Sequence, residues 1–282
     1  MTQTLAGPSV VVGVDGSRAA AAAAVWAIDE AVGRGLALRL VAATGSGAAE
    51  SASPVESAEA AVRSAAAAVA FTGRPDLPPV QTAVITAGPQ AALLEQSRTA
   101  AMICVGLVGI RHFDPGRLGS TAGALIAGAH CPVAVIRAGR PPAAAAPGWV
   151  VVELDQTADS ATVLQAAIEE ARMRRAPLRV LGTWQSDDPG AGGAAESARV
   201  VRAQLDRRLE TWTHRYPDLD VKPVAVHGSG LGFLADNADS IQLVVIGARN
   251  TAGVGDMLGP AGLAALGTTA CAVLVIDPQR LL

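Results

Sequence analysis

The sequence predicts an α/β fold of two tandem, open, Rossmann-like domains, each with a five-stranded parallel sheet covered by helices on both faces. Three observations lead to this prediction. The 282 residues suit two domains of ordinary size, and half of them are apolar, which is enough for a core in each. Short apolar runs alternate with longer helix-like segments, as in parallel sheets, whose neighbouring strands need crossover connections. The pattern of the first half also returns in the second half.

An internal repeat defines the two halves. Residues 10–44 align with residues 150–184 at a constant offset of 140 without a gap, and 12 of these 35 positions are identical. The identical pairs include Asp15 with Asp155, and a glutamate and two arginines also match. An alanine-rich chain gives chance matches of alanine, but it does not give charged matches in one register. The alignment therefore indicates a duplication.

A proline-rich stretch separates the two repeats. The letters AGRPPAAAAPG at 138–148 contain prolines that interrupt both helices and sheet ladders. We therefore expect a first domain over residues 1–139, a linker over 140–148 and a second domain over 149–282.

The elements of the first repeat follow one another with clear boundaries. Asp15, Gly16 and Ser17 form the turn after the first strand, and Gly33 and Gly35 are expected to end the first helix. The predicted strands cover 10–14, 36–42, 80–86, 101–105 and 133–136, and the predicted helices cover 19–32, 56–70, 90–99 and 121–129. The second repeat keeps this order, with strands near 150–154, 178–183, 221–226, 242–246 and 273–276.

The composition argues against several classes of protein. The formal net charge is −3 and no basic patch is visible, so nucleic-acid binding is not expected. No apolar run reaches the roughly 18 residues of a membrane span, and the first residues lack the pattern of a signal peptide. Cys104, Cys131 and Cys271 stand in apolar runs and are expected to be buried, reduced thiols. We expect a cytoplasmic protein that binds neither nucleic acid nor membrane.

Two loops lie where an open α/β sheet binds ligands, at the carboxyl ends of strands beside the point where the strand order reverses. The first loop is 13–17 and the second is 106–121. Glycines in the second loop let backbone amides approach a ligand, and Gly119, Ser120 and Thr121 open a helix whose amides and dipole favour an anion. The pattern predicts a phosphate site. The alternative interpretation is a glycine-rich turn with a serine N-cap and no ligand, which would have a similar sequence.

The second loop carries a signature that resembles a known family. The spacing Gly106-x2-Gly109-x9-Gly119-Ser120 matches every fixed position of the ATP-binding signature G-x2-G-x9-G-[S/T] of the universal stress proteins. The segments VVVGVDGS at 10–17, AGPQAALLEQS at 87–97 and GSTAGALIAGAHCPVAVIRAG at 119–139 also resemble that family. The resemblance implies an adenine nucleotide α-hydrolase-like fold and ATP, with or without Mg²⁺, as the ligand.

The resemblance also implies roles for individual residues. Asp15 would contact the adenosine end of the nucleotide, and Val41 or Ala42, at the end of the second strand, would lie against adenine. The turn Gly106–Gly109 and the pair Gly119–Ser120 would hold ribose and phosphates, with the amides of Gly119 and Ser120 facing the phosphates. The full expected set is Gly13, Val14, Asp15, Val41, Ala42, Gly106, Val108, Gly109, Arg111, Gly119, Ser120 and Thr121.

The chain departs from the family pattern at several positions. The family often has Ser-Arg between the first two glycines, whereas this chain has Leu107-Val108, so Arg111 is the candidate for the missing basic contact. The loop of the second repeat begins Gly247-Ala248-Arg249-Asn250, and its later Gly259 is followed by Pro260. Proline supplies neither a hydroxyl nor an amide donor. We expect weak ATP binding or none in the second repeat.

Three functions compete for this sequence. The resemblance implies a non-catalytic ATP-binding module of stress response or signalling. An enzyme acting on ATP lacks its usual motifs, because Lys222 is the chain's only lysine and neither a Walker P-loop, GxGxxG nor GxSxG is present. His112 and Asp114, the His–carboxylate pair near the loop, are interpreted as surface residues, and slow ATP hydrolysis stays open. An interaction module without a nucleotide predicts degenerate loops in both repeats, which the first repeat contradicts.

The resemblance further implies association through the fifth strand of each repeat. Residues 133–136 and 273–276 offer apolar strands for this purpose. The expected assembly is a homodimer, or a pseudo-dimer of the two repeats within one chain, and the sequence does not choose between them.

Overall fold

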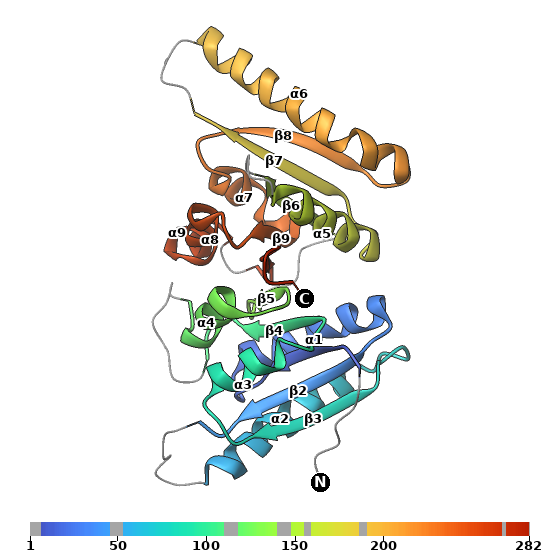
Figure 1. The fold of residues 1–282 in the computed structure, drawn as a ribbon, viewed down its shortest axis with the longest axis vertical. Coiled ribbons are helices and arrows are strands. Elements are labelled where there is room, and N and C mark those ends of the chain that lie inside the picture. Colours follow the sequence, from blue (N-terminus) through green and yellow to red (C-terminus); the bar gives the residue numbers. More distant parts are fainter. Residues whose placement is uncertain are drawn as a thin grey trace. The chain divides into compact units, whose positions relative to one another are not determined.

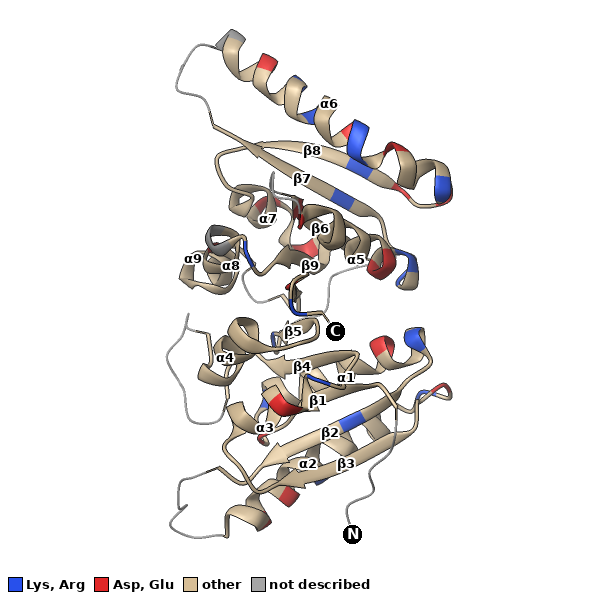
Figure 2. Cartoon of the chain, in the orientation of Figure 1, with Lys and Arg blue, Asp and Glu red and all other residues tan. Residues whose placement is uncertain are grey.

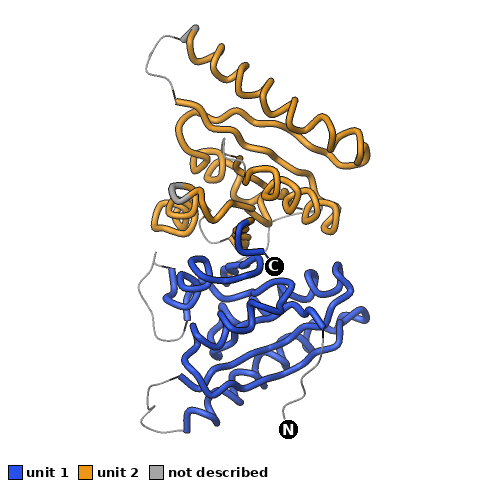
Figure 3. Tube along the Cα trace, viewed as in Figure 1, with its two compact units in different colours: residues 1–138, 279–282 blue, residues 139–278 orange. Residues whose placement is uncertain are grey.

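The computed structural model describes residues 7–45, 53–109, 118–139, 148–154, 159–185, 191–266 and 269–281. The chain forms two compact units (Figure 3), unit 1 with residues 1–138 and 279–282, and unit 2 with residues 139–278. Most of the predicted linker, residues 140–147, lies outside the described residues.

Unit 1 contains an open parallel sheet with helices (Figure 1). Its described strands are β1 (Ser9–Gly13), β2 (Ala37–Ala43), β3 (Val80–Ile85), β4 (Met102–Gly106) and β5 (Val133–Ile136). Its described helices are α1 (Arg18–Arg34), α2 (Pro54–Phe71), α3 (Pro89–Gln96) and α4 (Ser120–Gly128). The strands lie in the order β3-β2-β1-β4-β5, and each neighbouring pair is parallel.

The helices of unit 1 form two layers around an aliphatic sheet. α1 packs against α2, and α3 packs against α4. Right-handed crossovers that advance in opposite directions along a sheet run over opposite faces, so each pair covers one face. Val10, Val12, Leu38 and Leu40 are 0% exposed because the sheet is buried from both sides.

Unit 2 repeats this strand-and-helix architecture. Its described strands are β6 (Trp149–Leu154), β7 (Leu178–Trp184), β8 (Val221–His227), β9 (Ile241–Gly247) and β10 (Ala272–Ile276). Its described helices are α5 (Ser160–Met173), α6 (Ala191–Arg215), α7 (Leu231–Asn237), α8 (Thr251–Leu258) and α9 (Pro260–Ala265), with a 3-10 turn η1 (Ala238–Ser240). The strand order β8-β7-β6-β9-β10 matches that of unit 1, again with parallel pairs.

The predicted strands are confirmed, but two predicted helix ends are wrong: α1 ends at Arg34 instead of 32, and α3 ends at Gln96 instead of 99. Each strand begins and ends within one residue of its predicted bounds. α1 continues through Gly33 and is capped by Gly35, whose φ of 64° lies in the left-handed region. Glycine is tolerated inside a helix, whereas the left-handed cap position favours it, so Gly35 rather than Gly33 sets the end.

The two units differ in the size of the buried residues on their helices. Buried alanines such as Ala27 of α1 and Ala65 of α2 let these helices approach closely. α6 carries the buried Leu205 instead, packs on β7 and β8, and makes few contacts with α5. Gly182 of β7 permits this packing, because a Cβ there would lie 2.8 Å from Cγ1 of Val201. Figure 1 shows α6 lying along β7 and β8.

Each unit buries a glutamate near the end of its first helix. Glu30 is 0% exposed and Glu170 is 1% exposed, and each pairs with the arginine one turn later, Arg34 or Arg174. The side chain of Arg174 is 8% exposed, against 27% for Arg34. A carboxylate that has lost its hydration depends on such a partner, because the partner's charge replaces the interaction with water.

We predict that Arg174→Met lowers the free energy of unfolding by about 3 kcal/mol, because Glu170 loses the cation that offsets its burial. Arg34→Met should cost less, since water already reaches Arg34 and screens its charge. Equilibrium urea unfolding measures both changes. The double variant Glu170→Met/Arg174→Met removes both charges and should recover most of the loss. A loss below about 1 kcal/mol for Arg174→Met would contradict this account.

Candidate functional site

In unit 1 the ends of β1 and β4 lie where the strand order reverses, which is the position of the ligand crevice in open α/β sheets. The chain continues from β1 to β2 and β3 on one side of β1, whereas β4 and β5 lie on the other side. The helices that follow β1 and β4 therefore lie on opposite faces of the sheet, and the loops between strand and helix border the place where open α/β sheets bind ligands. The close approach of Gly109 to Asp15 shows that the two predicted loops meet there.

Asp15 closes the turn between β1 and α1. Its Oδ1 accepts a hydrogen bond from the Ser17 amide at 2.9 Å, and Ser17 Oγ accepts one from the Ala20 amide at 3.1 Å as the N-cap of α1. Gly16 between them has a φ of 85°, a conformation that favours glycine. The turn leaves Asp15 exposed at the rim of the crevice.

Gly109 lies directly against the carboxylate of Asp15. A Cβ on Gly109 would lie 2.6 Å from Asp15 Oδ2, well inside van der Waals contact. The absence of a side chain at 109 therefore allows the β4 loop to approach the β1 loop. This contact joins the two parts of the predicted site.

The expectation that the Gly119 amide faces a phosphate is wrong. The Gly119 N–H donates to the Leu107 carbonyl at 2.9 Å, and an amide has a single hydrogen to donate. A Cβ on Gly119 would lie 3.0 Å from the same carbonyl oxygen. The Leu107 amide donates to the Ile136 carbonyl at 2.8 Å and so extends the ladder between β4 and β5. Gly119 thus ties the start of α4 to the end of β4.

The first turn of α4 is presented at this crevice. Gly119 is its N-cap and supplies no side-chain bond, and first-turn amides have no partner within a helix. Ser120 is exposed and Thr121 is partly exposed, so hydroxyl donors accompany the positive end of the helix dipole. Gln90, at the start of α3, donates from Nε2 to the Ser120 carbonyl at 3.3 Å. Sequence reasoning missed this contact of Gln90, because it depends on how α3 packs on α4.

Two of the predicted glycines serve helix packing. A Cβ on Gly13 would lie 2.6 Å from Cδ1 of Leu93 in α3. A Cβ on Gly106 would lie 2.7 Å from Cβ of Ala19 and 2.9 Å from the amide nitrogen of Ala20, both in α1. These glycines therefore bring α1 and α3 close to the ends of β1 and β4 and shape the crevice from below.

The end of β2 forms one side of the crevice. The Val14 amide donates to the Val41 carbonyl at 2.9 Å, and Val41 and Ala42 are each 1% exposed. β2 runs one residue beyond the predicted end, to Ala43, which is partly exposed. Sequence reasoning missed Ala43 because alanine has little strand preference, and its pairing with Ile85 of β3 holds it in the sheet.

The remaining predicted residues divide into two groups. Val108 is partly exposed beside Gly109 and lies at the crevice. Arg111, His112 and Asp114 lie outside the described residues, which stop at 109 and resume at 118. The basic contact assigned to Arg111 therefore stays a prediction.

In unit 2 the matching crevice is lined by charged side chains. Glu153 stands where unit 1 has Gly13, and Arg249 forms an ion pair with Asp159, with Nη1 and Oδ2 3.6 Å apart. The cavity that these residues line has a volume of about 10 Å³, which is room for about one water molecule. Asp155, the partner of Asp15 in the repeat, lies outside the described residues.

The loop of unit 2 after β9 is described throughout. It forms the helix α8, which is capped by Asn250, whose Oδ1 accepts a hydrogen bond from the Gly253 amide at 2.9 Å. Gly259 follows α8, and a Cβ there would lie 2.2 Å from the Gly255 carbonyl oxygen. Pro260 then begins α9 without an amide donor. Gly259 is thus required by the packing of its own loop.

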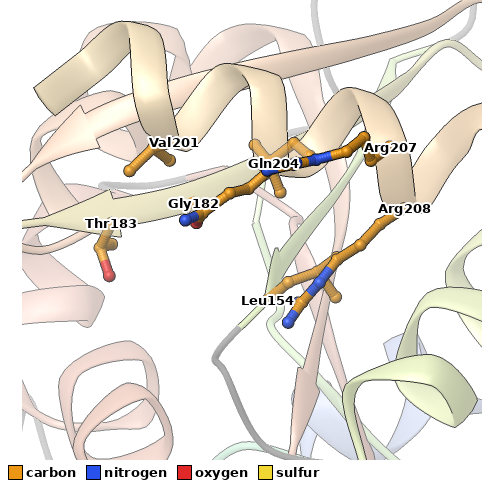
Figure 4. A pocket seen from close by; sticks show the side chains of 8 residues that line it. Leu154, Gly182, Thr183, Val201, Gln204, Arg207 and Arg208 are labelled. Atoms are coloured by element: carbon orange, nitrogen blue, oxygen red, sulfur yellow. The ribbon is translucent and has the colours of Figure 1, made fainter. Parts of the chain in front are cut away.

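A larger cavity of unit 2 lies beneath α6 (Figure 4). It has a volume of about 410 Å³ and is lined by the ends of β6 and β7 and by α6. In Figure 4 the side chain of Arg208 extends toward Leu154. The cavity opens where α6 makes few contacts with α5, so it follows from the bulkier residues of α6.

The three cysteines are buried in the strands and their surroundings. Cys104, Cys131 and Cys271 form no disulfide. Burial raises the pKa of the Cys131 thiol to about 12. This thiol stays protonated at neutral pH and is a poor nucleophile, because the thiolate is the reactive form.

Within the described ranges of the chain, no three or more His, Cys, Asp or Glu side chains cluster in a way that would hold a metal ion. Among the described helices, none combines the length and the apolar character needed to cross a membrane.

Comparison with known proteins identifies the family. The model of the universal stress protein family matches residues 8–137 and again residues 149–277. The chain therefore belongs to the universal stress protein family and carries two family domains in tandem. Universal stress protein Rv2028c of Mycobacterium tuberculosis is 40% identical over 289 aligned residues, which cover 100% of both chains.

Solved structures agree with this fold. A universal stress protein from Archaeoglobus fulgidus superposes with a TM-score of 0.68 at 12% identity and covers 95% of this chain and 96% of its own. A family protein from Arabidopsis thaliana, solved with AMP bound, covers 46% of this chain and 92% of its own at 15% identity, with a TM-score of 0.33. The first likeness shows the fold, and the AMP is a property of the second protein.

We predict that Gly109→Ala weakens binding of an ATP analogue at least tenfold, about 1.4 kcal/mol, because the new Cβ displaces the Asp15 carboxylate. Gly123→Ala in α4 is the matched control, since its Cβ would meet only Cδ2 of Leu118 at an ordinary 3.7 Å. Fluorescence titration measures binding, and thermal melts check folding. Equal binding by the two variants would show that the contact between Gly109 and Asp15 is unimportant to the site.

Proposed function

We propose that this protein is an ATP-binding universal stress protein, a non-catalytic module of stress response or signalling with one nucleotide site, in unit 1. One observation carries the proposal: Gly109 lies against Asp15 at the switch point, beside the first turn of α4. The site offers a carboxylate to a ribose hydroxyl and helix amides to a phosphate. The family includes a member solved with AMP bound, so an adenine nucleotide is the ligand class to test first.

In unit 1 the proposed nucleotide site has room for the ligand, because few side chains project into it. Gly109 presents no side chain at the switch point, and α4 begins with two hydroxyl residues. Unit 2 instead has Glu153 at the end of its first strand and Pro260 at the helix start. A carboxylate repels a phosphate, and proline lacks the amide that would bind it. These differences support a single site per chain.

The proposal assigns no catalytic residue. Among the described residues of the unit 1 crevice, Asp15 is the carboxylate, and its Oδ1 already accepts the Ser17 amide. Hydrolysis of ATP needs a base or a water-positioning residue and usually metal-binding carboxylates. Slow hydrolysis is the alternative function, with His112 and Asp114 as its candidates.

We further propose that the protein is cytoplasmic and associates through its apolar strands. Reduced, buried cysteines are typical of the cytoplasm, where thiols are kept reduced. The strands β5 and β10 are apolar, and association through such strands would give a homodimer or a pseudo-dimer within the chain. The association through these strands rests on the family resemblance.

We predict that one ATP binds per chain and that Asp15→Ala weakens binding about tenfold or more, because the adenosine end loses its carboxylate. Arg249→Ala, at the matching crevice of unit 2, should leave binding unchanged. Equilibrium dialysis with radiolabelled ATP counts the sites. Two equivalent sites per chain would overturn the asymmetry, and no binding at all would favour an interaction module without a nucleotide.

We predict no turnover of ATP at ordinary enzyme rates, because the described crevice lacks a free general base. Multiple-turnover phosphate release, measured with and without Mg²⁺, tests this. Release that is catalytic and that disappears in the Gly109→Ala variant would establish the slow ATPase instead.

A further inference from the structure

A second cavity of unit 2 lies at the outer strand β8, away from both crevices, and is lined by residues of β6, β7, β8, α6 and α7. It has a volume of about 380 Å³, within the usual range for a small-molecule pocket. Three basic residues, Arg179, Arg202 and Lys222, line it together with apolar residues. Figure 2 shows basic positions side by side on the neighbouring strands β7 and β8.

The register of the sheet creates this cavity. Arg179 is paired with Lys222 across β7 and β8, so both side chains leave the sheet on the same face. Gly182, three positions after Arg179, packs against Val201 of α6 and therefore belongs to the other face. Among the described helices, α6 covers that other face and contributes Arg202 to the cavity, and α7 contributes Phe233.

Aromatic rings form the apolar floor. The Trp149 ring is stacked with Phe233, with centroids 6.4 Å apart and 26° between the planes. The Arg179 guanidinium lies 4.8 Å from the centroid of the Trp149 ring, in a cation–π contact. Aromatics make up 3% of this chain, so two of them at one cavity are a local concentration. Val224 and Pro223 complete the apolar lining.

The charges at the rim are predominantly positive. Arg179 is 8% exposed and donates from Nη2 to Oδ2 of Asp220 at 3.1 Å. Lys222 is 64% exposed, with Nζ 4.0 Å from Oδ1 of the same carboxylate. Arg202 is exposed and forms no ion pair with any described residue. Three cations against one carboxylate leave a net charge of about +2 at an apolar cavity.

The first repeat lacks these features at the matching positions. Trp149 corresponds to Ser9, Lys222 to Gln81 and Val224 to Ala83, as the strand registers show. Arg179 corresponds to Arg39 and is the basic residue common to both repeats. Unit 2 therefore keeps the sheet face of unit 1, but it carries aromatic and basic side chains that unit 1 lacks at these positions.

We propose that this cavity binds a small amphipathic carboxylate, a molecule with an apolar body and one anionic head. The body would lie on Trp149, Phe233 and Val224, because apolar surface removed from water stabilises a complex. The head would bind Lys222 and Arg202, whose charge-assisted hydrogen bonds to a carboxylate leave the ion pair between the buried Arg179 and the exposed Asp220 in place. The proposal is independent of nucleotide binding in unit 1.

Lys222 supplies a direct measurement on the unmodified protein, because it is the chain's only lysine. Dodecanoate below its micelle concentration is the probe. It should slow reductive methylation of Lys222 at least fivefold at saturation, whereas the N-terminal amine, read in the same mass spectrum, should react at its usual rate. Unchanged methylation of Lys222 at every dodecanoate concentration overturns the proposal. Protection that appears without ligand as protein concentration rises also overturns it, because a second chain then covers this face.

Variants and ligand analogues test the chemistry. Lys222→Gln, which introduces the residue of the first repeat, should weaken dodecanoate binding in calorimetry at least fivefold, and Arg202→Gln should act in the same direction. Arg207→Gln is the matched control, since it lies on the same helix but lines the cavity beneath α6. Dodecylammonium, with the same chain and the opposite charge, should not bind measurably. Equal binding of dodecylammonium, or a loss confined to Arg207→Gln, would refute this site.

Discussion

Parallel strand pairing is the constraint on which each unit depends. A chain that runs parallel to its previous strand must return over a face of the sheet, and right-handed crossovers decide which face. In unit 1 this reverses the strand order between β1 and β4, so that the loops after both strands meet at one edge. The hydrogen bond from Gly119 to Leu107 then fixes the start of α4 beside them. The candidate site is thus positioned largely by backbone, which explains why glycines dominate it.

The two units show how one fold diverges after duplication. Alanines let α1 and α2 pack together, whereas Leu205 and its neighbours hold α6 over β7 and β8. At the switch point, unit 2 has the charged pair Arg249 and Asp159, where unit 1 has Val108 and Ala19. At the sheet face, unit 2 adds Trp149 and Lys222. Each change uses side chains on an unchanged set of strands, so new chemistry required no new topology.

The strands, the repeat and the two crevice loops could be predicted from sequence, because buried parallel strands are continuous runs of Val, Ile and Leu between turn residues. The roles of single glycines could not. Gly13 and Gly106 make room for neighbouring helices, whereas Gly109 lies against Asp15. The Gly119 amide donates a hydrogen bond to the Leu107 carbonyl. The sequence shows the same residue type at all four positions. These roles depend on contacts between residues far apart in the chain. The helix α8 was missed for a related reason, since its glycines disfavour a helix that the cap of Asn250 supports.

Pro223 has a consequence for the solubility of the protein. It lies in β8, the outer strand of the unit 2 sheet, between Lys222 and Val224. An outer strand exposes backbone donors and acceptors that can pair with a strand of another molecule. Proline removes one donor from that edge, and the neighbouring lysine would have to be desolvated by an added strand. The residues that shape the basic cavity therefore also protect the sheet against edge-to-edge aggregation when the protein is concentrated.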